Sequence, residues 1–253
     1  TSPAHGRGRR RRRCRRLAWH RAYRRPPTPD RGCRRLDTPT LVVDDNRPTV
    51  GGDDDAVATR TAPVDVVAVG ASAGGLVALE QLLGALPVDF PAPVLVVQHV
   101  HPRHPSLLTD ILARHTDLPV QVAEDGLRLR AGTVVVAIPD HHLVVRPDGS
   151  CGLTHSAPVR FVRPSVDVLF ESIAQVHGPR SAGVVLTGSG RDGAMGAAAI
   201  HRAGGVVIAQ DPVSAEFRSM PEATIAAGAA DLVLDLTDIP AALCDLAGTS
   251  ETT

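Results

Sequence analysis

The sequence contains no lysine, so all 27 of its basic side chains are arginines. These arginines are spread unevenly along the chain. Residues 1–35 hold 14 arginines against one aspartate, a net charge of +13, whereas residues 36–60 carry −4 and residues 61–253 carry −9. The formal net charge of zero is therefore the sum of three unlike segments, and each segment has to be interpreted by itself.

Aromatic residues, long apolar runs and paired cysteines are also scarce. Aromatics make up 2% of the chain, so a core must be built from valine, leucine, isoleucine and alanine. No run of about 18 apolar residues is present, which argues against membrane insertion, and no apolar stretch follows the basic start as in a signal peptide. The four cysteines form no CxxC pair, which argues against a disulfide framework or a zinc site. We therefore expect a cytoplasmic protein without a metal or other cofactor.

Residues 1–60 differ in composition from the rest of the chain. Their blocks of like charge lack apolar periodicity, which predicts a disordered arginine-rich arm followed by an acidic linker. Such an arm would bind nucleic acid only nonspecifically, through phosphates. Because a lysine-free, GC-rich gene also yields arginine- and proline-rich peptide when read out of frame, we expect residues 1–35 to be partly an artefact and infer no partner from them. Residues 249–253 are expected to be a short tail.

From residue 61 to residue 248 the pattern is strand, turn and helix, repeated. A valine-rich run at 64–69, interrupted only by Asp65, and continuous apolar runs at 94–97 and 184–186 are typical of strands buried on both faces. Segments with helical spacing, such as 76–86 and 164–173, alternate with them. This order predicts an α/β domain with a doubly wound, mostly parallel sheet and helices on both faces. Ligands of such sheets bind at the carboxyl ends of the strands.

Three polar residues follow the predicted strands at that edge. Ser72 lies in a Gly-x-Ser-x-Gly turn after the first strand, His99 ends the second, and Asp192 lies between glycines after the strand at 184–186. A hydroxyl, a base that takes its proton and a carboxylate that orients the base are what nucleophilic acyl transfer requires. The glycines around Asp192 also leave backbone N–H groups accessible, and these could form an oxyanion hole.

Each of these residues has an alternative interpretation. The turn at 70–75 also resembles a dinucleotide loop, but Ser72 stands where that loop has its middle glycine, and His99 stands where an acid should follow. A histidine more often has a structural role, and one of His141 and His142 could line a cleft. Asp192 precedes a predicted helix and could simply cap it.

Six segments, taken together, resemble the catalytic domain of the chemotaxis protein-glutamate methylesterases. They are Val-Gly-Ala-Ser-Ala-Gly-Gly (69–75), Val-Gln-His (97–99), Ala-Glu-Asp-Gly (123–126), Arg-Pro-Ser-Val-Asp-Val-Leu-Phe (163–170), Leu-Thr-Gly-Ser-Gly-Arg-Asp-Gly-Ala (186–194) and Met-Pro-Glu-Ala (220–223). The order Ser, His, Asp also differs from that of the α/β-hydrolases, Ser, Asp, His.

The resemblance implies hydrolysis of γ-glutamyl methyl esters on methylated chemoreceptor helices, with release of methanol, and it allows glutamine deamidation. Ser72 would be the nucleophile, His99 the general base and then acid, and Asp192 the orienting carboxylate. The oxyanion and substrate contacts would come from Ala73, Gly74, Ser189 and Gly190. The family often has Thr in place of Ala73 and Met in place of Ser189, which would alter oxyanion geometry without removing the triad.

The resemblance also implies a place in the phosphorelay of chemotaxis signal transduction. The best-known members of the family carry a receiver domain before the catalytic domain. Only 60 residues precede the predicted catalytic domain here, so we predict no phosphorylation switch within this chain. Arg128, Arg130, Arg160 and Arg163 are candidates for contact with an acidic receptor helix. An esterase or amidase of another signalling pathway and a nucleotide-binding module remain as alternatives.

Overall fold

The computed structural model describes residues 62–100 and 107–248; the expected disordered arm and the tail lie outside them. In chain order the elements are β1 (Val66–Ala71), α1 (Gly75–Ala85), β2 (Val94–Gln98), α2 (Leu108–Leu112), β3 (Val120–Val122), β4 (Val134–Val136), β5 (His142–Val145), β6 (Cys151–Thr154), α3 (Val166–His177), a short 3₁₀ helix (Gly178–Arg180), β7 (Ser181–Val185), α4 (Ala194–Arg202), β8 (Val206–Gln210), α5 (Ser219–Ala226), β9 (Leu232–Leu234) and α6 (Ile239–Leu246).

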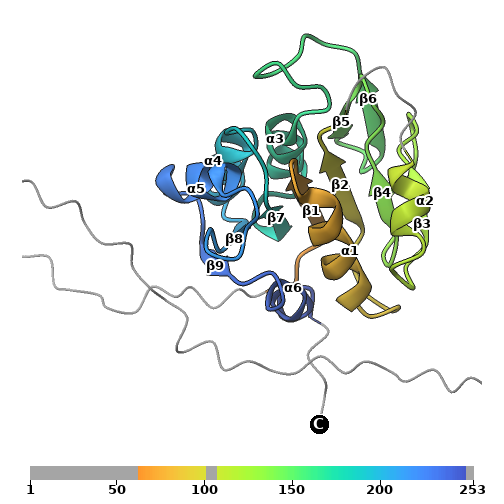
Figure 1. The fold of residues 1–253 in the computed structure, drawn as a ribbon. Helices are drawn as coiled ribbons and strands as arrows, with labels where there is room; N and C mark the ends of the chain where they lie inside the picture. Colours follow the sequence, from red (N-terminus) through yellow and green to blue (C-terminus); the bar gives the residue numbers. More distant parts are fainter. Residues whose placement is uncertain (1–61, 101–106, 249–253) are drawn as a thin grey trace, which may run out of the picture.

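Seven of these strands form one sheet in the order β3-β4-β2-β1-β7-β8-β9, and every pairing in it is parallel. The prediction of a doubly wound sheet is confirmed, and its main sheet is parallel throughout. β5 and β6 form a separate antiparallel hairpin. Figure 1 shows this hairpin beside α3, away from the edge formed by β9. The chain leaves β1 toward β2 on one side and β7 toward β8 on the other, so the two directions diverge between β1 and β7.

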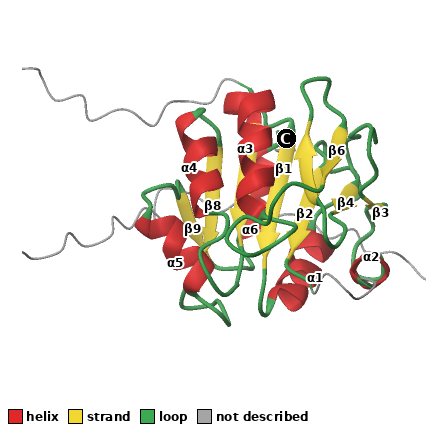
Figure 2. Ribbon diagram, turned by 90° about the horizontal axis from the view of Figure 1, so that it is seen from above, coloured by secondary structure: helices red, strands yellow, loops and turns green. Residues whose placement is uncertain are grey.

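Helices cover both faces of the sheet, and each face has its own apolar core. The alternation of side chains along a strand divides β1 between them, with Val67 and Val69 facing one core and Val66 and Ala68 facing the other. Helices α1, α2 and α6 pack in the first core. Helices α3, α4 and α5 pack in the second together with the β5–β6 hairpin. In Figure 2, α3 and α4 lie side by side over the strands, and α1 and α2 lie at the opposite face.

The close approach of α3 and α4 depends on a glycine. A Cβ atom at Gly196 of α4 would lie 2.5 Å from the Cβ of Phe170 and 2.8 Å from the carbonyl oxygen of Asp167, both in α3. Phe170 and Ile173 of α3 are fully buried in the second core. Burying side chains of this size contributes about 1.5–3 kcal/mol each. The contact brings the N-terminal ends of the two helices together at the carboxyl edge of the sheet.

The chain closes on itself at the opposite edge. The N–H of Val64 donates to the carbonyl of Leu246 at the end of α6 (2.9 Å), and the N–H of Asp65 donates to the carbonyl of Arg180 (2.8 Å). Helix α2 begins at Leu108, shortly after residues 101–106, which lie outside the described part of the chain. No helix among residues 62–100 and 107–248 has the length and apolar character needed to cross a membrane.

Candidate active site

The loop from β1 to α1 holds Ser72 beside two neighbouring strands. The N–H of Ser72 donates to the carbonyl of Thr187, directly after β7 (3.1 Å), and its own carbonyl accepts the Nε2 of Gln98, the last residue of β2 (2.7 Å). Gly74, the residue before α1, has φ +72°, which favours glycine. The backbone is therefore fixed on both sides of Ser72, at the start of a helix.

His99 lies next to Ser72 in the sheet. Ala71 of β1 pairs with Gln98 of β2, so the two following residues, Ser72 and His99, occupy adjacent positions. The Nε2 atom of His99 is 2.8 Å from the Oδ2 atom of Asp192. The side chains of His99 and Asp192 are 13% and 4% exposed, so this contact is shielded from solvent. With Nε2 directed at the carboxylate, Nδ1 is the ring nitrogen left for proton exchange with a hydroxyl.

Four donors surround the carboxylate of Asp192. Oδ2 accepts from His99 and from the N–H of Val166 (2.6 Å), while Oδ1 accepts from the hydroxyl of Ser165 (2.7 Å) and the N–H of Asp167 (3.1 Å). Burial disfavours the charged form of Asp192. The hydrogen bonds from His99, from the backbone N–H groups and from Ser165 outweigh burial and hold the pKa of Asp192 below its usual value. The carboxylate thus stays charged opposite His99.

Asp192 and Asp167 cap each other's helices. Asp192, which precedes α4, accepts the first N–H groups of α3. Asp167, in the first turn of α3, accepts at Oδ1 the N–H groups of Gly193 (2.9 Å), Met195 (3.0 Å) and Gly196 (2.8 Å) at the start of α4. Burial raises the pKa of Asp167, and the nearby charge of Asp192 acts in the same direction. Asp192 is therefore a capping residue, but of α3 and not of the helix that follows it.

His142 supports this arrangement from the hairpin. It is fully buried at the start of β5. Its Nδ1 accepts the N–H of Ser165 (3.1 Å), and its Nε2 lies 3.2 Å from the carbonyl oxygen of Ala157. Of the two neighbouring histidines considered as cleft residues, His141 is half-buried and lies edge-on to the ring of His155. The fully buried His142 joins two loops, those that hold Ala157 and Ser165.

Four residues were predicted to hold an oxyanion, and they lie on two loops. Ala73 and Gly74 stand at the start of α1, and Ser189 and Gly190 are exposed in the loop after β7. A Cβ atom at Gly188 would lie 2.9 Å from the Cβ of Ser72, so this second loop passes close to the serine. Within the described residues, the N–H of Gly188 donates to the carbonyl of Phe217 (2.8 Å) and is therefore engaged. The backbone N–H groups of the four predicted residues remain the candidates for holding an oxyanion.

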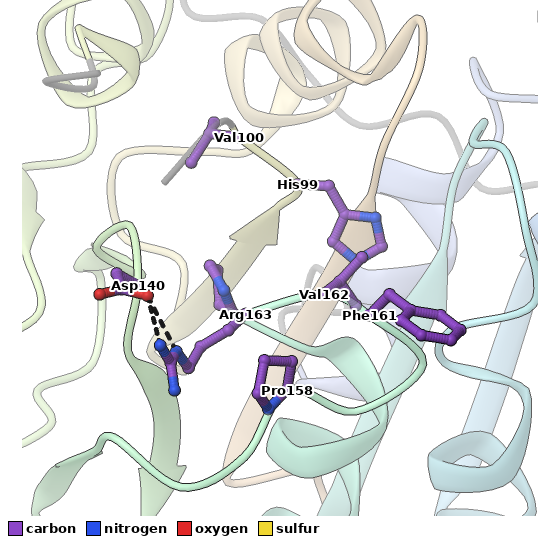
Figure 3. A pocket seen from close by; sticks show the side chains of 8 residues that line it. His99, Val100, Asp140, Pro158, Phe161, Val162 and Arg163 are labelled. Atoms are coloured by element: carbon purple, nitrogen blue, oxygen red, sulfur yellow. Dashed lines mark hydrogen bonds and ion pairs between the residues drawn. The ribbon is translucent and has the colours of Figure 1, made fainter. Parts of the chain in front are cut away.

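A pocket opens beside His99. It is lined by His99, Val100, Asp140, Pro158, Phe161, Val162, Arg163 and Pro164. Figure 3 shows His99 at one side of this pocket and the ion pair of Arg163 with Asp140 at the other. Phe161 is fully exposed and has φ +68°. Within the described part of the chain, no group of three His, Cys, Asp or Glu side chains is placed to bind a metal ion.

Two of the four arginines proposed for receptor contact are already engaged within the domain. The Nε of Arg160 donates to Oδ2 of Asp167 (3.2 Å), and the Nε of Arg163 donates to Oδ1 of Asp140 (3.1 Å). Arg128 and Arg130 are exposed. The guanidinium groups of Arg160 and Arg163 therefore hold the loop before α3, which the spacing of these charges along the sequence does not indicate.

The residues that support Asp192 could not be predicted as such from the sequence. Ser165 and Asp167 had no predicted role and His142 only a possible place in a cleft, although Ser165-Val166-Asp167 follows Pro164 at a predicted helix start. Small polar residues at such a start are typical of caps, and this signal could have identified Ser165. The partner of each cap comes from a distant part of the chain, so the sequence alone does not reveal it.

A family model described as "CheB methylesterase" matches residues 67–243, which include most of the sheet and of both cores and all three triad candidates. The chain belongs to the CheB methylesterase family.

Two relatives are both named protein-glutamate methylesterase/protein-glutamine glutaminase. A protein-glutamate methylesterase/protein-glutamine glutaminase of Anaeromyxobacter dehalogenans is 45% identical over 192 residues, which cover 76% of this chain and 56% of that protein. A protein of Cupriavidus pinatubonensis with the same name is 40% identical over 224 residues, covering 81% of this chain and 66% of that protein. The CheB methylesterase catalytic domain of Thermotoga maritima is 36% identical, with a TM-score of 0.70, and covers 73% of this chain and 100% of that structure.

This chain spans about half the length of the first relatives, 56% and 50% for two proteins of Anaeromyxobacter dehalogenans. A putative member from Leptospira interrogans differs in this respect, because the matched segment covers 91% of its length.

Proposed function

We propose that this chain is a protein-glutamate methylesterase that hydrolyses γ-glutamyl methyl esters with Ser72, His99 and Asp192 as its catalytic triad. One observation carries the proposal. Ser72 lies at the N-terminal end of α1 and next to His99, whose Nε2 is bound to the buried carboxylate of Asp192 at 2.8 Å. A serine in this position has a base, an oriented carboxylate and candidate backbone N–H donors within one site.

In the first half of the reaction, the Oγ of Ser72 attacks the ester carbonyl carbon while Nδ1 of His99 takes its proton. The carbonyl oxygen becomes an oxyanion, which the N–H groups of Ala73 or Gly74 and of Ser189 or Gly190 would stabilise. The N-terminal end of α1 favours negative charge at the same place. The carbon–methoxy bond then breaks, methanol leaves with the proton from His99, and the glutamyl group stays bound to Ser72 as an ester.

In the second half, His99 takes a proton from a water molecule, and the resulting hydroxide attacks the glutamyl ester. The bond to the Oγ of Ser72 breaks, the proton returns to the serine, and a free glutamate side chain is released. Asp192 keeps its charge throughout and stabilises the imidazolium that forms twice. Its four hydrogen-bond donors favour this charged state.

The substrate in this proposal is a methylated helix of a chemoreceptor, and the pathway is chemotaxis signalling. The names of the relatives specify protein-bound glutamate esters. Arg128 and Arg130 are candidates for contact with the acidic receptor, since Arg160 and Arg163 are paired inside the domain. The pocket beside His99, with the exposed ring of Phe161 at its edge, is where the ester side chain would enter. Action on a protein of another signalling pathway is the alternative.

The test is methanol release from a receptor carrying labelled methyl esters. We expect wild-type protein to release methanol and Ser72→Ala to fall to near the uncatalysed rate. Ser219→Ala, at an exposed serine that begins α5, is the matched control and should behave as wild type. Methanol release that persists undiminished in Ser72→Ala would overturn the proposal.

A second activity, deamidation of receptor glutamines, is suggested by the words "protein-glutamine glutaminase" in the names of the relatives. The same attack of Ser72 on an amide would release ammonia in place of methanol. Ammonia release from an unmethylated receptor with glutamines, lost in Ser72→Ala, would support it. A wild type that releases methanol but no ammonia would limit the enzyme to esters.

A further inference from the structure

Resting on the proposed triad, we infer that His142 is a positioning residue that acts through Ser165 to orient the carboxylate of Asp192. It joins the wall of the substrate pocket to the acid of the triad. No bond of the reaction forms or breaks at His142, which is buried and separated from Asp192 by Ser165.

The hydrogen bonds form one continuous series from the pocket loop to His99. The carbonyl of Ala157 accepts from Nε2 of His142 (3.2 Å), Nδ1 of His142 accepts from the N–H of Ser165 (3.1 Å), and the hydroxyl of Ser165 donates to Asp192 (2.7 Å). Asp192 then binds His99 (2.8 Å). Ala157 precedes Pro158, which lines the pocket beside His99. The same histidine thus holds a loop of the pocket and the residue that begins α3.

This geometry fixes the state of the ring. A ring that accepts at Nδ1 and faces a carbonyl with Nε2 is neutral and carries its proton on Nε2. Burial lowers the pKa of His142, which keeps the neutral form at neutral pH. No other common side chain offers an acceptor and a donor at these two points in so rigid a frame, so the requirement is specific to histidine.

The charged groups that act on the pKa of His142 have partners of their own. Arg163, whose positive charge adds to the effect of burial on His142, is paired with Asp140. Asp192, whose negative charge acts in the opposite direction, binds His99, and Asp167 binds Arg160. His142 therefore does not balance a charge. Its role is to hold Ser165 so that the hydroxyl stays on Oδ1 of Asp192.

Two substitutions at His142 distinguish its hydrogen bond to Ser165 from its hydrogen bond to Ala157. His142→Asn places an amide oxygen near the position of Nδ1 and keeps an acceptor for Ser165, whereas His142→Gln places an amide N–H near the position of Nε2 and keeps only the donor to Ala157. We expect His142→Gln to lose about tenfold or more in kcat with little change in KM, as for a misplaced catalytic group. His142→Asn should lose clearly less.

The pH profile distinguishes positioning from a general loss of packing. When Ser165 no longer shares the charge of Asp192, that charge acts more strongly on protonated His99. The acid limb of the kcat profile should therefore move to higher pH in His142→Gln, by roughly half a unit or more, because hydrogen bonds to charged groups are the stronger ones. His141→Gln, at the neighbouring half-buried histidine, is the control and should show neither effect.

The experiment measures methanol release against pH for the full chain, with melting temperatures as the check on folding. Equal losses in both His142 variants, a loss confined to KM, or an unmoved acid limb would overturn the inference. If His142→Gln does not fold, the pH profile of Ser165→Ala is measured in its place. An acid limb that does not move in Ser165→Ala would also overturn the inference. Ser72→Ala in the same assay separates the two proposals: if it is inactive while His142→Gln equals wild type, only this inference fails.

Discussion

Asp192 is the residue on which the contacts of the site converge, and Ser165 is the donor that can be removed from it most cleanly. The folded-state pKa of Asp192 is lowered despite burial, so its charge stabilises the fold above the unfolded carboxyl pKa of about 3.9. This stabilisation is lost as the pH falls through the folded pKa. Any substitution that raises the pKa of Asp192 should therefore weaken the protein most at neutral pH.

We predict that Ser165→Ala lowers the free energy of unfolding by roughly 1–2 kcal/mol at pH 7, because a hydrogen bond to a charged group is lost. The difference from wild type should shrink only when the pH falls below the unfolded carboxyl pKa of about 3.9 and through the lowered folded pKa of Asp192. Urea unfolding at several pH values measures this. Comparing the two proteins cancels the separate contribution of Asp167, and a difference that grows at low pH would contradict the prediction.

At the scale of elements, the structure joins α3 and α4 by exchanging their caps. Asp167 accepts three N–H groups at the start of α4 through the single atom Oδ1. We predict that Asp167→Ala, which leaves these buried groups without an acceptor, destabilises the protein by about 2 kcal/mol or more. Asp167→Asn keeps an oxygen at this position and should cost clearly less. Thermal unfolding checks both, and equal costs would show that the cap is not the cause.

The arrangement of elements could be predicted from the sequence more fully than the contacts between them. Apolar runs that alternate with helical patterns are local signals, and the residues after each strand meet because the carboxyl ends of parallel strands share one edge. Ser72, His99 and Asp192 are predicted as site residues in this way. The pairs Ser165–Asp192 and Asp167–Gly196 join positions 27 and 29 residues apart, so nothing in the local pattern indicates them.

The partners of charged side chains could not be predicted from the sequence either. Arg160 and Arg163 were candidates for receptor contact because they are cationic residues in a domain of net charge −9. In the folded domain both are committed to carboxylates, Arg163 to Asp140 at a distance of 23 residues along the chain. A charged residue therefore becomes a candidate for a partner only after its contacts within the fold are known.

At the scale of the whole molecule, we propose that residues 61–248 form the catalytic domain. Both apolar cores are built within residues 64–247, and the bond from Val64 to Leu246 closes the two ends of this segment. A chain limited to residues 61–248 should therefore melt within a few degrees of the full chain and release methanol at a similar rate. A large loss of stability or activity would assign residues 1–60 a role in the fold or the site.

The central claim is that Ser72, His99 and Asp192 act as one catalytic unit, and a double variant tests it most directly. The measurement is the rate of methanol release by Ser72→Ala, Asp192→Asn and the two combined. Because residues of one unit are strongly non-additive, we predict that each single change removes most of the activity and that the double variant is no slower than Ser72→Ala alone. A double variant slower by the product of the two single losses would contradict the account.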